Sequence, residues 1–249
     1  MKVIKFLLFI AILLISCNLY ADNSEEEKKY IVSVKLPLIP KISIMQISTK
    51  LSINNNEKYE LYFNIKTLNL IDYISNVNGD GYVSGDIIDG IYMPNIYKYD
   101  YIRKSKKKSV SLKYMDGNII EEIFIPKFNK DELTPINSEQ KNNTIDPATL
   151  FLRLVDFKSN NQCTDNINVY DGKRRYDIIF KKEKLGNQII ECLAWQNRIG
   201  GYKEDKVDPL TNTDIVKIRY EMILDNKFLE LYAKKGLIEI TIEEINQKN

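Results

Sequence analysis

Short segments in which apolar and polar residues alternate make up most of the chain, and Ile, Val and Tyr dominate the apolar positions. A period of two is that of a β-strand with one buried face, and Gly, Asn and Asp between the segments mark turns. The alternation of Tyr97, Tyr99 and Tyr101 is typical of such an amphipathic strand. We therefore predict a mainly β protein, a curved antiparallel sheet or an incomplete β-barrel. The predicted strands span residues 42–53, 57–67, 80–92, 107–115, 118–125, 166–170, 173–182, 187–195, 214–225, 228–234 and 237–243.

Residues 147–157 have the pattern of a buried helix rather than a strand. Asp146 can accept hydrogen bonds from the free N–H groups of the first turn, and Pro147 suits the first helical position. Apolar side chains cover most of the circumference and leave Arg153 and Asp156 as a narrow polar edge. Because a helix of this kind must be buried on most sides, we expect it on the concave side of the sheet or in the barrel mouth. The apolar residues are Leu150, Phe151, Leu152, Leu154, Val155 and Phe157.

The 249 residues are enough for one sizeable core and few for two unrelated domains. Residues 129–144 are polar and read as a surface loop between two groups of strands. Neither group alone closes its own sheet edges, so we predict a single β domain over residues 42–249 with this loop inside it.

Residues 1–21 have the three parts of a signal peptide: basic Lys2 and Lys5, a short apolar run, and small or polar residues that end at Ala21. Cleavage after Ala21 would release the protein, and residues 22–41, which start with a polar run from Asp22 to Lys29, would then form a flexible leader. A second route stays open, because the residues around Cys17 resemble a bacterial lipobox in which this cysteine is lipidated. In either case membrane contact is expected only through this end of the chain.

The charge of the chain argues against nucleic acid as a partner. Lys2 and Lys5 are the only charged residues in the first 21, so 34 of the 36 basic residues remain to face 34 acidic ones. A domain without a basic excess lacks the electrostatic footprint of a nucleic-acid binder.

Most catalytic chemistry is disfavoured as well. The chain has no histidine, which removes the commonest general base and the commonest zinc ligand. The run from Asn76 to Gly81 alternates oxygen-bearing side chains as a calcium loop does, but Ile87 stands where the bidentate glutamate belongs, so a hairpin turn is favoured. We expect no catalytic residue, no metal site and no cofactor.

Two cysteines, Cys163 and Cys192, remain after the leader. In an oxidising compartment two cysteines most simply form one disulfide, which would stabilise the fold by roughly 3–4 kcal/mol. The alternative is a pair of unconnected buried thiols.

Arg174 is predicted as a structural or ligand-binding residue. A two-residue turn at Asp171 and Gly172 would pair Val169 with Arg174, which points Arg174 into the core and Arg175 to solvent. A buried guanidinium needs a partner, for which Asp146 or backbone carbonyl groups are available. It would then anchor the anionic end of a ligand; the alternative is a side chain that reaches solvent at the sheet rim.

Several motifs carry a family resemblance. The runs Asp146-Pro147-Ala148-Thr149-Leu150 and Tyr170-Asp171-Gly172-Lys173-Arg174-Arg175-Tyr176-Asp177, with Cys163, Cys192 and Gly200-Gly201-Tyr202, resemble the exported bacterial family called domain of unknown function 3108. Gly81-Tyr82-Val83-Ser84-Gly85 and Met93-Pro94-Asn95-Ile96-Tyr97 look like the corresponding strand pair in its first half. The resemblance implies the periplasm or cell envelope of a Gram-negative bacterium and a curved antiparallel sheet. It implies no reaction.

Together these features predict a non-enzymatic envelope protein that binds a hydrophobic or lipid-like ligand in the concave face of its sheet. The alternative is a structural or assembly factor of the envelope that acts through protein–protein contacts.

Overall fold

The computed structural model of the chain describes residues 23–129, 131–155, 166–185, 189–203, 216–221 and 227–245. Within them, thirteen antiparallel strands form one sheet in the order β7-β6-β5-β4-β3-β2-β1-β13-β12-β11-β10-β9-β8. The helices are α2 (Asn69–Ser75), the short 3₁₀ helix η1 (Glu139–Lys141) and α3 (Pro147–Val155). The strands are β1 (Ser24–Leu36), β2 (Ile39–Asn54), β3 (Lys58–Thr67), β4 (Val77–Ile88), β5 (Ile91–Arg103), β6 (Lys106–Met115), β7 (Asn118–Ile125), β8 (Ile167–Tyr170), β9 (Arg175–Leu185), β10 (Ile189–Gly200), β11 (Val216–Glu221), β12 (Lys227–Lys235) and β13 (Ile238–Glu244).

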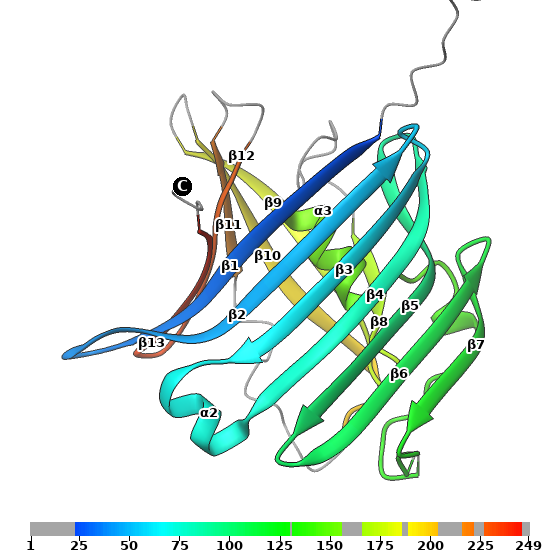
Figure 1. Cartoon of the computed structure of the whole chain (residues 1–249), viewed down its shortest axis with the longest axis horizontal. Coiled ribbons are helices and arrows are strands. Elements are labelled where there is room, and N and C mark those ends of the chain that lie inside the picture. Colours follow the sequence, from blue (N-terminus) through cyan, green and yellow to red (C-terminus); the bar gives the residue numbers. More distant parts are fainter. Residues whose placement is uncertain are drawn as a thin grey trace, which may run out of the picture.

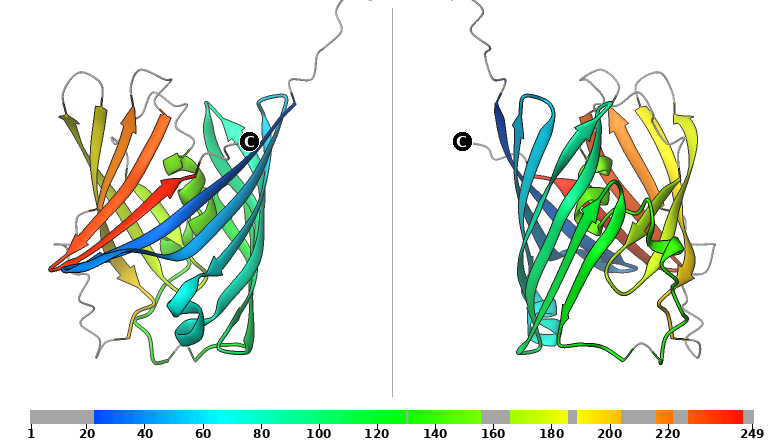
Figure 2. Two further views of the ribbon diagram at one scale, coloured as in Figure 1. Left: turned by 60° about the vertical axis from the view of Figure 1, so that its left-hand side comes forward. Right: turned by 90° about the vertical axis from the view of Figure 1, so that its right-hand side faces the viewer.

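The sheet consists of two meanders that meet at the first and last strands. Strands β1 to β7 follow one another, as do β8 to β13, and β1 pairs with β13 from Tyr30 opposite Glu244 to Lys35 opposite Glu239. The two edge strands, β7 and β8, are therefore consecutive in the chain. In Figures 1 and 2 the sheet curls so that β2–β5 and β9–β12 form facing walls with α3 between them.

Irregular pairing accounts for part of this curvature. Register shifts occur between Val32 and Ser33 in β1, between Ser84 and Gly85 in β4, and between Lys113 and Tyr114 in β6. A bulge bends the strand that carries it and increases its twist. The long strands can therefore wrap around the helix instead of forming a flat layer.

Side chains connect the two edge strands, which form no ladder with each other among the described residues. Glu122 of β7 accepts a hydrogen bond from the Tyr170 hydroxyl of β8 at 2.9 Å and pairs with Lys141 at 2.9 Å. The backbone of Ile145 forms two hydrogen bonds with β8. The Ile145 N–H donates to the backbone carbonyl oxygen of Asn168, and the Tyr170 N–H donates to the backbone carbonyl oxygen of Ile145, each at 2.9 Å. The segment before α3 thus covers an edge that would otherwise expose unpaired backbone groups.

Helix α3 lies where the sequence predicts it, inside the curve. It contacts β5 and β8 and also β12 on the facing wall. Leu152 packs in the core cluster around β3 to β6, and Val155 in the cluster around β10 to β12. The helix therefore joins the two cores of the sheet.

The flexible leader predicted over residues 22–41 is wrong, because Ser24–Leu36 is strand β1 and Ile39 begins β2. The charges that suggested a leader lie on an exposed part of the sheet, where Lys50 of β2 is 2.7 Å from Glu25 and 3.9 Å from Glu27. Further along β1, Tyr30 is buried in the core. The predicted signal segment 1–21 lies outside the described residues.

The single strand predicted over residues 80–92 is also wrong. The chain turns at Asp89 and Gly90, whose φ angles of 52° and 77° suit a two-residue hairpin turn, so β4 and β5 are separate strands.

The turn predicted at residues 76–81 lies mostly inside β4, and helix α2 was not predicted. The polar loop 129–144 contains only η1 among its described residues.

Candidate functional site

A cavity of about 490 Å³ lies between α3 and the inner face of β2, β3, β5 and β6. Phe63 of β3, Tyr99 of β5 and Val110 of β6 form its sheet side, and Ala148 and Phe151 form its helix side. The end of β7 with the segment 126–128 and the loop after β8 border the remaining sides. The cavity is thus built by elements of both meanders and depends on the curl of the sheet.

Aromatic rings form a continuous wall of the cavity. Tyr99 stacks on Tyr101 with 4.8 Å between ring centroids and on Phe63 at 5.6 Å, and Phe63 stacks in turn at 6.5 Å from Tyr97. Burial, and secondarily the nearby Tyr101 and Asp80, raises the pKa of Tyr99 to about 12. The phenol is therefore neutral at physiological pH, so this wall offers apolar ring faces without negative charge.

Three glycines of β4 make room for aromatic rings, two of them in this wall. A Cβ at Gly81 would lie 2.0 Å from the Phe63 ring, one at Gly79 would lie 2.8 Å from the Tyr99 ring, and one at Gly85 would lie 2.7 Å from the Tyr59 ring. These glycines alternate with larger residues along the strand, so their positions face the concave side. This alternation in Gly79-Asp80-Gly81-Tyr82-Val83-Ser84-Gly85 is the signal that a turn interpretation misses.

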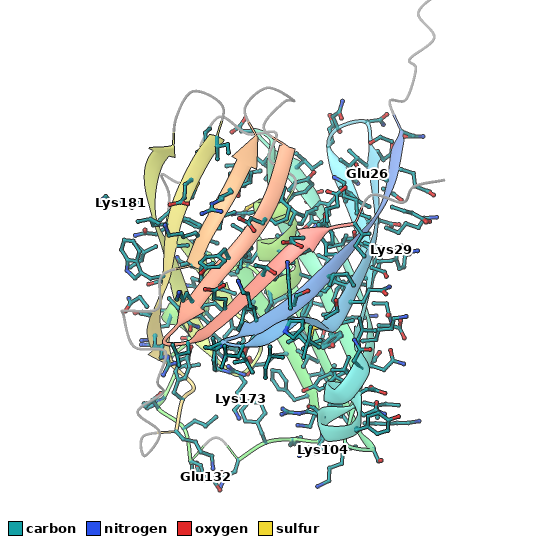
Figure 3. The ribbon with its side chains drawn as sticks, turned by 90° about the vertical axis from the view of Figure 1, so that its left-hand side faces the viewer. Glu26, Lys29, Lys104, Glu132, Lys173 and Lys181 are labelled. Atoms are coloured by element: carbon teal, nitrogen blue, oxygen red, sulfur yellow. The ribbon has the colours of Figure 1, made fainter. Side chains whose placement is uncertain are left out.

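Cations gather at one border of the cavity. Lys108, Lys127, Lys173 and Arg174 line it together with the acidic residue Asp171. Figure 3 shows Lys173 toward the lower end of the molecule in that view, well away from Glu26 and Lys181. We call Lys108, Lys127, Lys173 and Arg174 the cationic mouth. Sequence reasoning found only Arg174 among them, because the others depend on how the sheet curls.

The loop between β8 and β9 differs from its prediction. Tyr170 pairs with Arg175, so the connection comprises the four residues 171–174 rather than two. The Asp171 carboxylate holds this loop, since Oδ1 accepts the N–H groups of Lys173 at 2.8 Å and Arg174 at 2.6 Å. A side chain that bonds backbone groups two and three residues later replaces the tight turn assumed from the sequence.

The two arginines therefore exchange the environments predicted for them. The Arg174 side chain is 52% exposed and lies 3.3 Å from Asp171, whereas the Arg175 side chain is 8% exposed. The Arg175 Nε donates a hydrogen bond to the backbone carbonyl oxygen of Gln140 at 2.6 Å, and Arg175 also forms an ion pair with Asp177. The prediction that Arg174 points inward, with Asp146 or carbonyl groups as its partner, is wrong. Arg174 nevertheless borders the cavity.

Asp146 caps α3 and takes no part in the cavity lining. Its Oδ1 accepts the N–H groups of Ala148 at 2.8 Å and Thr149 at 2.9 Å, and its Oδ2 accepts the Thr149 hydroxyl at 2.6 Å. The Thr149 hydroxyl also lies 3.1 Å from the Tyr59 hydroxyl. Complete burial raises the pKa of Asp146, and these hydrogen bonds act in the opposite direction. The residue therefore positions the helix against the sheet.

Arg153 does not form the solvent edge predicted for it. The Arg153 Nε donates a hydrogen bond to the backbone carbonyl oxygen of Tyr92 in β5 at 2.9 Å, and burial lowers the pKa of the Arg153 guanidinium. Asp156, the other member of the predicted polar edge, lies outside the described residues. Arg153 thus ties α3 to the sheet.

The predicted disulfide and lipidation involve residues that the structure does not describe. Cys192 is buried on β10, but Cys163 and Cys17 lie outside the described residues, so the disulfide and the lipidation remain predictions. Within the described ranges, no three His, Cys, Asp or Glu side chains are grouped as a metal site would require. No helix in those ranges has the length and apolar character to cross a bilayer. What the site offers is apolar surface with a cationic border.

The fold and the cavity define a class: a protein of one open, barrel-like antiparallel sheet that encloses a helix and an internal apolar cavity. More particularly, the chain belongs to the family described as protein of unknown function DUF3108, whose model matches residues 29–220.

Two solved structures are similar over most of the chain. One is a β-barrel-like protein of domain of unknown function DUF1849 from Brucella abortus, with 9% identity, 88% of this chain and 94% of that chain covered, and a TM-score of 0.46. The other is a DUF1329 family protein from Desulfovibrio piger ATCC 29098, with 7% identity, 95% and 88% covered, and a TM-score of 0.23. No curated protein matches the chain in sequence.

Proposed function

We propose that this chain is a non-enzymatic protein of the cell envelope that holds a hydrophobic, lipid-like ligand in the cavity beside α3. The observation that supports it is the cavity itself, whose volume of about 490 Å³ and aromatic and aliphatic lining suit a small apolar molecule. A chain without histidine, whose carboxylate at this site is engaged in holding a loop, is better equipped to bind than to catalyse.

Export is part of this proposal, and the first 21 residues support it. Cell fractionation tests the location, and Cys17→Ser separates the two processing routes. A membrane-bound product that the substitution releases supports lipidation, whereas an unchanged soluble product supports ordinary cleavage. A product retained in the cytoplasm contradicts export.

An apolar cavity makes a quantitative demand on its ligand. Burial of each methylene group contributes about 0.8 kcal/mol, which is roughly a fourfold gain in affinity. A series of straight-chain 1-alkanols should therefore bind more tightly with each added carbon until the cavity is full, and then level off. Displacement of the neutral dye Nile red measures this series without requiring the natural ligand.

A matched pair of substitutions tests whether the alkanols occupy this cavity. Ile65 lines the cavity, whereas Ile102 lies on β5 with 40% exposure and is not part of the lining. Ile65→Trp should remove space for about two methylene groups and weaken binding of the longest alkanols roughly fifteenfold. Ile102→Trp should leave the series unchanged. Equal effects of the two substitutions would contradict the assignment.

Native mass spectrometry of the protein from its own envelope provides a second test. A co-purifying lipid supports the proposal. A stable protein partner with no small molecule, together with no binding of any alkanol, would instead favour the structural or assembly factor.

A further inference from the structure

The charged residues around the cavity are unbalanced in sign. Among the residues that the structure describes, four cations and one carboxylate line it, although the chain after residue 21 has equal numbers of basic and acidic residues. Elsewhere on the same meander some exposed lysines have partners, as Lys113 has Glu121 at 2.5 Å. An excess of one charge at a cavity border attracts ligands of the opposite charge.

The one carboxylate is already engaged. Asp171 Oδ1 accepts hydrogen bonds from two backbone N–H groups, both in its own loop. Asp171 Oδ2 lies 3.3 Å from Arg174 Nε. Among the described residues, Lys108, Lys127 and Lys173 form no ion pair. The cationic mouth therefore carries more positive charge than Asp171, the carboxylate that lines the cavity, can balance.

Two of these ammonium groups lie near aromatic rings that line the cavity. Lys108 Nζ is 6.0 Å from the ring centroid of Tyr101, the outermost member of the stacked wall, and Lys173 Nζ is 5.6 Å from that of Phe128. Burial, together with the positive charges of Arg174, Lys108 and Lys203, lowers the pKa of Lys173, and Asp171 opposes this shift. A bound anion would relieve the repulsion among these groups.

We propose that the ligand is an anionic amphiphile whose apolar chain lies along the wall formed by Tyr101, Tyr99 and Phe63 and whose carboxylate or phosphate head is bound at the cationic mouth. This inference rests on the proposed function, since it assigns a head group to the ligand of the same cavity. The chain fills the space beside α3, and the head accepts hydrogen bonds from Lys108, Lys173 and Arg174, which are stronger than those between neutral groups.

The experiment compares amphiphiles with the same tail and different heads on the full mature protein, again by displacement of Nile red. The probes are dodecanoate, dodecyl phosphate, 1-dodecanol and dodecyltrimethylammonium, each below the concentration at which it forms micelles. Dodecanoate or dodecyl phosphate should bind at least about tenfold more tightly than 1-dodecanol, because a charge-assisted hydrogen bond contributes that much. The relative strength of the two anions identifies the head. Their advantage should shrink as salt is added.

Neighbouring lysines on β6 provide the matched control. Lys108 lines the cavity, whereas Lys107 is exposed and is not part of the lining. Lys108→Met combined with Lys173→Met should reduce the preference for the anions over 1-dodecanol, because only Lys127 and Arg174 of the cationic mouth remain. Lys107→Met should leave this preference unchanged. The head-group and salt comparisons on the unsubstituted protein need no variant, so they decide the matter even where a variant is unstable.

The outcomes separate the two proposals. If none of the amphiphiles displaces the dye, the proposed function itself fails. If 1-dodecanol or dodecyltrimethylammonium binds as tightly as both anions, the cavity binds apolar chains and only the head-group assignment is overturned. An anion preference that is undiminished in the double variant also overturns it.

Discussion

Substitution of Gly81 by Ala should push the Phe63 ring into the cavity. Gly81 lies opposite Phe63 of β3 and Tyr99 of β5. A Cβ at Gly81 would lie 2.0 Å from Phe63 Cζ, and ordinary contact begins at 3.4 Å, so the ring must move by about 1.4 Å. Phe63 lines the cavity, so a ring that is pushed away from β4 moves toward the ligand space.

The cost follows from two opposing effects. Overpacking of a core site costs about 1–3 kcal/mol, whereas removal of a glycine from a strand gains about 0.5–1 kcal/mol. We therefore expect Gly81→Ala to lower the free energy of unfolding by about 1–2 kcal/mol, measured by urea denaturation with an unchanged m-value. The longest alkanols should also bind more weakly, because the displaced ring takes up space in the cavity.

A double-mutant cycle with Phe63→Leu tests the cause. If the Phe63 ring is what the added methyl group meets, Gly81→Ala should cost less than about 0.5 kcal/mol in the Phe63→Leu background. An equal cost in both backgrounds would refute the steric argument and place the strain in the backbone of β4.

Three further predictions concern stability. Burial acts to raise the pKa of Glu191, but hydrogen bonds from Lys217 and Arg219 outweigh it and lower the pKa overall. The stability that this pair of contacts contributes should be present above the unfolded-state pKa of about 4.3 and be lost as pH falls through the lower folded-state pKa. Glu191→Gln should therefore reduce the dependence of the free energy of unfolding on pH in that window. Asp146→Ala should cost about 1–2 kcal/mol by thermal unfolding and Asp146→Asn less, because only the amide still offers a capping oxygen; equal losses would contradict the capping role. Leu152→Ala should cost about 2–5 kcal/mol by urea denaturation, and a cost below about 0.5 kcal/mol would place α3 outside the core.

Features with a local physical cause could be predicted from the sequence. The capped start of α3 at Asp146 needs only a carboxylate before a proline, and the turn at Asp116 and Gly117 needs only two residues that tolerate positive φ, which are 51° and 75° here. Strand β1 was missed because its charges satisfy one another across strands, in a pairing that the local sequence does not show.

The candidate site depends on long-range geometry and was only partly predictable. That a buried helix should lie on the concave side follows from its apolar circumference. The Asp171 side chain decides which of the two arginines is exposed. Its hydrogen bonds hold a loop that is two residues longer than predicted, which changes the register of β8 and β9, so that Arg174 is exposed and Arg175 is buried. The cationic mouth was not predictable, since β6, the end of β7 and the loop after β8 meet only when the sheet has curled.

The pairing of β1 with β13 has a consequence for how the protein is made. The backbone groups on one side of Tyr30 to Lys35 gain their partners only from Glu239 to Glu244, near the opposite end of the chain. As the chain emerges, the first meander therefore carries an unsatisfied edge through its apolar centre until the last strand arrives, and such edges template unwanted pairing with other chains. Contacts so distant in sequence also form slowly. A chain of this topology therefore gains from being kept unpaired until β13 is available.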